Sequence, residues 1–119
     1  MGEKIFTHEL DELNSIYAYI KTVNGKVKSF VVKLACTIGD KEVEVLRFDS
    51  GHGTPHVDYL NSKGDVVQKD WLKYLTNEQA LTIALDDIKT NYQLHRERFI
   101  GWQGKEKKRS RRRTRFNGR

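Results

Sequence analysis

The dipeptide Asn24-Gly25 lies between two stretches of β-like sequence and constrains the fold more than any other feature. The stretch before it, residues 15–23, is rich in Tyr and Ile, and the stretch after it, residues 26–38, alternates apolar and polar side chains. Asn-Gly is a strong hairpin signal, because both central residues of a type I′ turn adopt positive φ. The sequence therefore predicts that these two stretches pair as antiparallel strands.

Three further strands are predicted at residues 42–49, 56–61 and 66–71, because each is a short β-like run bounded by turn residues. In the first of these, Leu46 and Phe48 face one side and Val43 and Val45 the other, so we expect this strand in the middle of the sheet. In residues 1–13 the spacing of Phe6, Leu10 and Leu13 fits one or two helical turns, and we interpret this segment as an arm or a short helix. The short connections favour a five-stranded antiparallel meander.

A long helix is predicted from Thr76, which forms a capping box with Gln79. The residues that follow repeat apolar positions at steps of three and four, which is typical of a helix with one buried face. These positions are Leu81, Ala84, Leu85, Ile88, Tyr92, His95 and Phe99. The fold class is therefore predicted to be α+β: a curved five-stranded antiparallel sheet packed against one long C-terminal helix, residues 76–99.

The charge of the chain is unevenly divided. Residues 105–119 contain nine Lys or Arg and one Glu, a net charge of +8; because the whole chain carries +6, the first 104 residues carry −2. A segment so rich in like charge and so poor in apolar residues cannot drive its own burial. We predict a single domain at residues 1–104 and a disordered basic tail at residues 105–119.

The compartment is predicted from three observations. No run approaches the roughly 18 apolar residues of a membrane span, and the N-terminus lacks the pattern of a secretory signal. Cys36 is the only cysteine, so it cannot form an internal disulfide, and its position on an apolar strand face favours a buried, inert thiol. We expect a cytoplasmic protein that does not contact membranes.

The basic tail indicates a nucleic-acid partner, because each phosphate that a cation neutralises releases counterions. Arginine dominates the tail and matches phosphate geometry. A solubilising tail, or one that docks an acidic protein, remains open. The predicted nucleic-acid-binding residues are Arg96, Arg98, Lys105, Lys107, Lys108, Arg109, Arg111, Arg112, Arg113 and Arg115.

The candidate catalytic residues all lie in residues 47–58. Two imidazoles four residues apart, His52 and His56, could act as general acid and general base at neutral pH. Arg47 could stabilise a phosphoryl transition state, as metal-free RNA cleavage would require. Asp58 lies two residues after His56 on the same strand face, where it could orient an imidazole.

Two other interpretations of the same stretch remain open. The imidazoles with Asp49 or Asp58 could bind zinc, iron or manganese, but Gly53 and Pro55 exclude the helix on which such a histidine spacing would be informative. We therefore prefer acid/base chemistry and expect no metal and no cofactor.

The third interpretation is structural. Asp49, Ser50 and His52 could hydrogen-bond the backbone of a tight Gly-rich connection, while Pro55 fixes its exit. Outside this stretch, His95 lies on the apolar face of the predicted helix and is interpreted as a core or boundary histidine.

The motif Arg47-Phe-Asp-x-x-His-Gly-x-x-His56 precedes a helix of the form Ala80-Leu-x-x-Ala-Leu-x-Asp-Ile-Lys-x-Asn-Tyr. Over roughly residues 41–100 the chain resembles a group of small uncharacterised prokaryotic proteins. More distantly, it resembles the TumE family of predicted toxins of toxin-antitoxin pairs. That resemblance implies that His52 and His56 match the family's histidine cluster and Asp49 its preceding acid, although the histidines here are fewer and more separated.

These features together predict an RNA-directed protein, with a toxin-type ribonuclease as its enzymatic form. In that form His52 and His56 are catalytic and Asp49, Asp58 and Arg47 support them. The partners expected are nucleic acid, RNA rather than DNA, and an antitoxin or another acidic protein. The alternative is a noncatalytic nucleic-acid-binding module or accessory protein that uses the basic tail.

Overall fold

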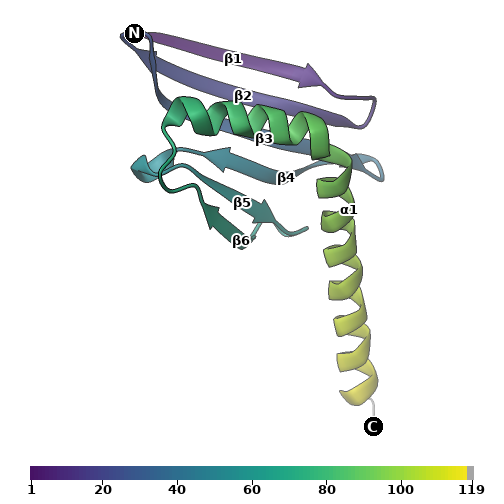
Figure 1. Ribbon diagram of the computed structural model, residues 1–119. Helices are drawn as coiled ribbons and strands as arrows, with labels where there is room; N and C mark the ends of the chain where they lie inside the picture. The colour runs from purple at the N-terminus through teal and green to yellow at the C-terminus, as the bar shows by residue number, and fades with distance from the viewer. Residues whose placement is uncertain (118–119) are drawn as a thin grey trace.

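The computed structural model describes residues 1–117, without the side chains of His52 and of residues 104–117. One open antiparallel sheet has the strand order of the sequence, β1-β2-β3-β4-β5-β6, and one long helix follows it (Figure 1). The α+β class and the meander are as predicted. The elements are β1 (Gly2–Glu9), β2 (Asn14–Val23), β3 (Lys26–Ile38), β4 (Lys41–Asp49), the 3-10 turn η1 (Gly51–Gly53), β5 (His56–Leu60), β6 (Val66–Trp71) and α1 (Asn77–Asn117).

The hairpin predicted at Asn24-Gly25 is confirmed. Asn24 and Gly25 have φ of 53° and 77°, and the flanking residues Val23 and Lys26 pair directly. The positive φ at both positions is what a type I′ turn requires, and it matches the right-handed twist of the strands it joins. This turn joins the two longest strands of the sheet, and their register shifts by one residue at an irregularity between Lys21 and Thr22.

The sheet has six strands, so the predicted number of five was wrong. Residues 2–9, interpreted as part of an arm or a short helix, form β1 and pair with β2 from Gly2↔Thr22 to Glu9↔Ser15. On β1 only Phe6 packs against the core, while Ile5 is 74% exposed. An edge strand with one face in solvent needs few apolar residues, and its pairing partner supplies the rest of its stability.

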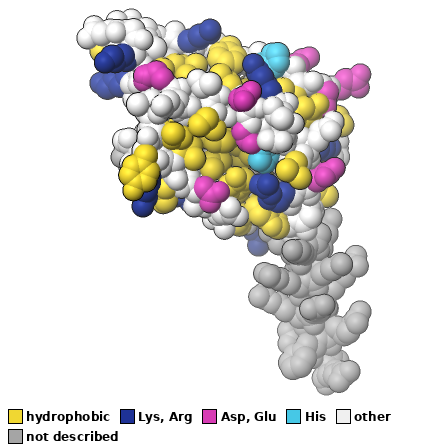
Figure 2. All heavy atoms as spheres, viewed as in Figure 1, with side chains coloured by type: hydrophobic (Ala, Val, Ile, Leu, Met, Phe, Trp, Pro, Cys, Tyr) yellow, Lys and Arg dark blue, Asp and Glu magenta, His cyan; other side chains and the backbone are white. Residues whose placement is uncertain are grey.

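The hydrophobic core lies between the sheet and the first half of α1, which packs mainly on β3 and β4 (Figure 1). The capping box is confirmed: the Thr76 amide donates to Gln79 Oε1 at 2.9 Å and the Gln79 amide donates to Thr76 Oγ1 at 3.1 Å. The predicted apolar face of the helix is buried or half-buried along its length. Beside α1, hydrophobic side chains remain visible on the same side of the molecule (Figure 2).

The predicted end of the helix at Phe99 was wrong, because α1 continues to Asn117. Gly101 and Gly104 weaken a helix by about 1 kcal/mol each but do not stop it, and the lysines and arginines that follow are good helix formers. At Asn91 the backbone departs from helical geometry, with φ −119° and ψ 16°, and α1 changes direction there. The disorder expected of residues 105–119 without a partner stays a prediction.

Cys36 lies on β3 and is fully buried, as predicted. Burial raises the pKa of its thiol to about 11, although the neighbouring Arg96 opposes the change. No helix within the described residues is long and apolar enough to cross a membrane.

Candidate functional site

The loop between β4 and β5 is held by its own polar side chains. Asp49 Oδ1 accepts a hydrogen bond of 2.6 Å from the Gly51 amide, and Ser50 Oγ accepts one of 2.8 Å from the Phe30 amide. A Cβ at Gly51 would lie 3.0 Å from Asp49 Oδ1, and Gly53 has a φ of +87°. The structural role proposed for Asp49 from the sequence is therefore observed, whereas Ser50 bonds the backbone of β3 and not that of the connection.

Four of the five predicted catalytic residues lie on one face of the sheet. Arg47 pairs directly with Asp58, and Asp49 pairs with His56, across β4 and β5. Directly paired residues of antiparallel strands share a face. The core residue Phe48 lies between Arg47 and Asp49 and points to α1. The four polar side chains therefore lie on the opposite face of the sheet, which α1 does not cover.

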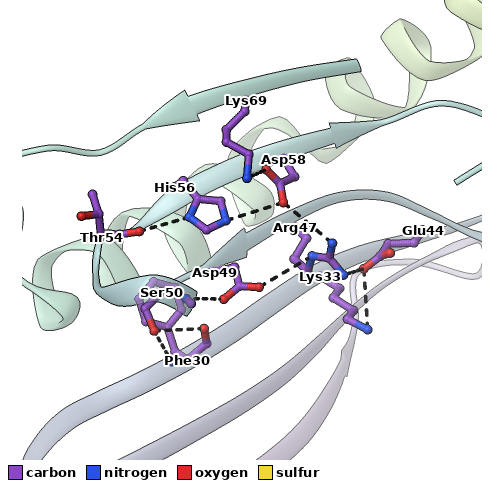
Figure 3. A network of polar contacts seen from close by, with 11 residues as sticks. Phe30, Lys33, Glu44, Arg47, Asp49, Ser50, Thr54, His56, Asp58 and Lys69 are labelled. Atoms are coloured by element: carbon purple, nitrogen blue, oxygen red, sulfur yellow. Dashed lines mark hydrogen bonds and ion pairs between the residues drawn. The ribbon is translucent and has the colours of Figure 1, made fainter. Parts of the chain in front are cut away.

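Asp58 is the centre of this cluster, and only 4% of it is exposed. Its Oδ2 lies 3.8 Å from Arg47 Nη2 and 3.6 Å from His56 Nε2, and its Oδ1 lies 3.3 Å from Lys69 Nζ. Figure 3 shows these side chains converging from three neighbouring strands, β4, β5 and β6. A buried carboxylate needs such cationic partners, because burial without them is costly.

Arg47 connects Asp58 to the rest of the face. Its Nε lies 3.9 Å from Asp49 Oδ2 and its Nη1 lies 3.8 Å from Glu44 Oε1, which is in turn 3.7 Å from Lys33 Nζ (Figure 3). Glu44 Oε1, Arg47 Nε and Asp58 Oδ1 are buried and have no hydrogen-bond partner. The network is therefore held mainly by charge at 3.3–3.9 Å rather than by hydrogen bonds.

His56 is 3% exposed, and both of its ring nitrogens face the protein. Nδ1 lies 3.1 Å from the Thr54 carbonyl oxygen, which only accepts, so this nitrogen carries a proton; Nε2 faces Asp58. The Trp71 ring lies 5.1 Å from the imidazole, centre to centre. A histidine that catalyses proton transfer keeps one nitrogen for the substrate. Both ring nitrogens of His56 thus face groups of the protein, and its catalytic role stays a prediction.

His52 belongs to η1, but its side chain lies outside the described part of the structure. Its convergence with His56 is therefore untested. Among the described residues there is no group of three or more His, Cys, Asp or Glu that could hold a metal ion. The network itself joins cations to carboxylates and offers no open set of ligands.

The two described members of the predicted nucleic-acid-binding set make internal contacts. Arg96 donates to Asn14 Oδ1 at 3.2 Å. Arg98 Nη1 lies 3.4 Å from His95 Nδ1, and the Arg98 guanidinium lies 5.0 Å from the centre of the Tyr59 ring. Both side chains are half-buried. The other eight predicted binding residues, from Lys105 to Arg115, lie outside the described side chains.

Lys33, Glu44, Lys69 and Trp71 belong to the network but were not predicted. Lys33 pairs directly with Arg47, Lys69 with Asp58, and Trp71 with His56. Only the register of the strands reveals these neighbours. Composition and motif spacing carry no such information.

A family model described as a domain of unknown function, DUF7718, matches residues 1–105. No curated protein and no solved structure matches the chain. The family match includes all six strands and the larger part of α1, and the basic segment lies almost entirely beyond it.

Proposed function

We propose that this chain, which belongs to the DUF7718 family, is an RNA-directed protein that binds nucleic acid through residues 105–119. The observation that carries the proposal is the division of charge, +8 in this segment against −2 in the first 104 residues. Such a segment attracts phosphates without reading sequence. The rest of the chain contributes no comparable excess of positive charge.

The binding is proposed to be noncatalytic, because the geometry at His56 supports a structural role. Its ring is 3% exposed, with one nitrogen directed at the Thr54 carbonyl and the other at Asp58. The face around it joins three carboxylates with Arg47 and two lysines, so it has no surplus of positive charge to hold a phosphate. The sheet is therefore proposed to serve as the body that carries the binding segment.

RNA is proposed over DNA for two reasons. Arginine-rich segments bind RNA by folding against its irregular shapes, and residues 105–119 contain six arginines. Over roughly residues 41–100 the chain also resembles a group of small uncharacterised prokaryotic proteins and, more distantly, the TumE family of predicted toxins. An acidic protein such as an antitoxin could occupy the same segment.

The test is the affinity of the full-length protein for a labelled RNA hairpin, measured by fluorescence anisotropy across a salt series. We expect replacement of Arg111, Arg112 and Arg113 by Gln to reduce affinity at least tenfold at low salt and to flatten the salt dependence. The matched control replaces Lys26, Lys28 and Lys63 by Gln; these exposed lysines lie in β3 and in the turn between β5 and β6. Equal affinities for the two triple variants would refute the proposal.

A ribonuclease is a second candidate, favoured by the convergence of Arg47, Asp58 and His56 within 4 Å. Its test is cleavage of mixed RNA by the purified protein, with and without a chelator. The comparison is a variant in which His52 and His56 are both replaced by Gln and whose circular dichroism matches that of the wild type. If cleavage is absent, or if it is unchanged in this variant, the ribonuclease hypothesis is refuted.

A further inference from the structure

A groove of about 420 Å³ lies on the face of the sheet opposite α1, over β1 to β4. Its lining includes Ile5, Tyr17, Tyr19 and Val31, which share this face because they pair across the strands as Ile5↔Tyr19 and Tyr19↔Val31, with Tyr17 two residues before Tyr19. Ile5 is 74% and Tyr17 36% exposed. The groove therefore has an apolar and aromatic floor that no element of the described chain covers.

Carboxylates stand at the edges of both tyrosine rings. The Tyr17 hydroxyl lies 3.0 Å from each carboxylate oxygen of Glu42, and the Tyr19 hydroxyl donates to Glu3 Oε1 at 3.0 Å. These contacts, more than any other influence, raise the pKa of both tyrosines. Each pair thus presents a ring face beside a fixed negative charge.

The groove has a net negative charge. Among its lining residues Lys33 is the only cation, and Glu44 lies 3.7 Å from its ammonium. Glu42 forms no ion pair with a cation among the described residues, and its hydrogen-bond partner is the neutral Tyr17 hydroxyl. An aromatic face beside a carboxylate is a site for guanidinium groups, which stack on rings and pair with carboxylates at the same time.

The chain itself contains a segment of the matching chemistry. Residues 105–119 carry six arginines and three lysines, against a net charge of −2 for the first 104 residues. In Figure 1 the second half of α1 points away from the sheet. The segment therefore cannot reach the groove of its own sheet without breaking α1, whereas a groove on another molecule is accessible to it.

We infer that the groove lined by Tyr17, Tyr19 and Glu42 binds the basic C-terminal segment of a second copy of this chain. Arginine side chains stack on the two tyrosine rings and pair with the carboxylates of Glu42 and Glu3. The result is a dimer in which each molecule donates its segment to the other. This inference is independent of RNA binding, and it is tested without RNA.

The test is the molar mass of the full-length protein, measured by sedimentation equilibrium over a concentration series at low and high salt. We expect a dimer whose dissociation constant rises at least tenfold when Glu42→Gln and Tyr17→Phe are combined. Replacing Arg111, Arg112 and Arg113 by Gln should have the same effect, and so should 0.5 M salt. Glu42 and Tyr17 lie on an exposed face, so these changes leave the core intact.

The matched control is Glu97→Gln, an exposed residue of α1. It removes one negative charge on the other side of the sheet and should leave the dissociation constant unchanged. A protein that is monomeric at all concentrations would overturn the inference, as would a dimer that is unaffected by the groove variants.

Discussion

His95 Nε2 lies 2.7 Å from Asp87 Oδ2, although the two residues are eight positions apart on α1. In a straight helix eight residues span about 12 Å along the axis. The contact exists because α1 bends at Asn91, whose side-chain amide donates to Asp87 Oδ1 at 2.9 Å. One carboxylate thus binds both the residue at the bend and the buried histidine beyond it.

Asp87→Ala is expected to lower the free energy of unfolding by about 1–3 kcal/mol, because it leaves the 5%-exposed His95 without its acceptor. Urea unfolding followed by circular dichroism measures the change. Asp86→Ala is the matched control, since Asp86 is the exposed neighbour on the same helix. Equal urea midpoints for the two variants would show that the contact does not stabilise the bend.

Asp58→Asn is expected to lower the free energy of unfolding by about 1–3 kcal/mol. The change keeps the shape of the side chain but removes the charge that faces Arg47 and Lys69. The cost is below that of a fully buried ion pair, because both cations are about a third exposed and partly screened by water. Urea unfolding measures it, with the exposed Asp65→Asn as control; a stability equal to the wild type would contradict the central role of Asp58.

Thr76→Ala is expected to lower the free energy of unfolding by about 1 kcal/mol, because the Gln79 amide loses its acceptor at the start of α1. Thermal and urea unfolding both report this loss. Thr90→Ala is the control, since it makes the same change at an exposed helical position. A loss of similar size at Thr90 would mean that the capping contact is not its cause.

The raised pKa of Cys36 should lower the free energy of unfolding as the pH rises from about 9 to about 11. Its folded pKa of about 11 lies above the ordinary value of 9.0, so in this range the unfolded chain loses the thiol proton while the folded protein keeps it. Stability should fall with a slope of up to about 1.4 kcal/mol per pH unit from this group. The difference in urea midpoint between the wild type and Cys36→Ala isolates it, and a pH-independent difference would contradict the raised pKa.

The sequence predicted the sheet well where signals were local. The Asn-Gly turn and the alternation of β3 placed both strands within one residue of their ends, and Thr76 with Gln79 placed the start of α1. β1 could not be found in this way, because a strand with a single core side chain, Phe6, is defined by its pairing with β2. Pairing is a long-range property.

The sequence predicted only part of the candidate site, because several of its contacts are also long-range. Arg47, Asp49, His56 and Asp58 share a face as period-two alternation requires, but the burial of His56 depends on Trp71 of the next strand. The contact of His95 with Asp87 depends on the bend at Asn91, which a straight helical repeat does not predict. The proposed role of His52 stays a prediction.

The bend at Asn91 sets the direction of the second half of α1. From there to Asn117 the helix measures about 39 Å, so a rotation of about 10° at the bend would displace its far end by about 7 Å. The direction of the basic C-terminal segment therefore depends on the contacts of one carboxylate, Asp87, with Asn91 and His95. A small change in these contacts would therefore shift the far end of α1.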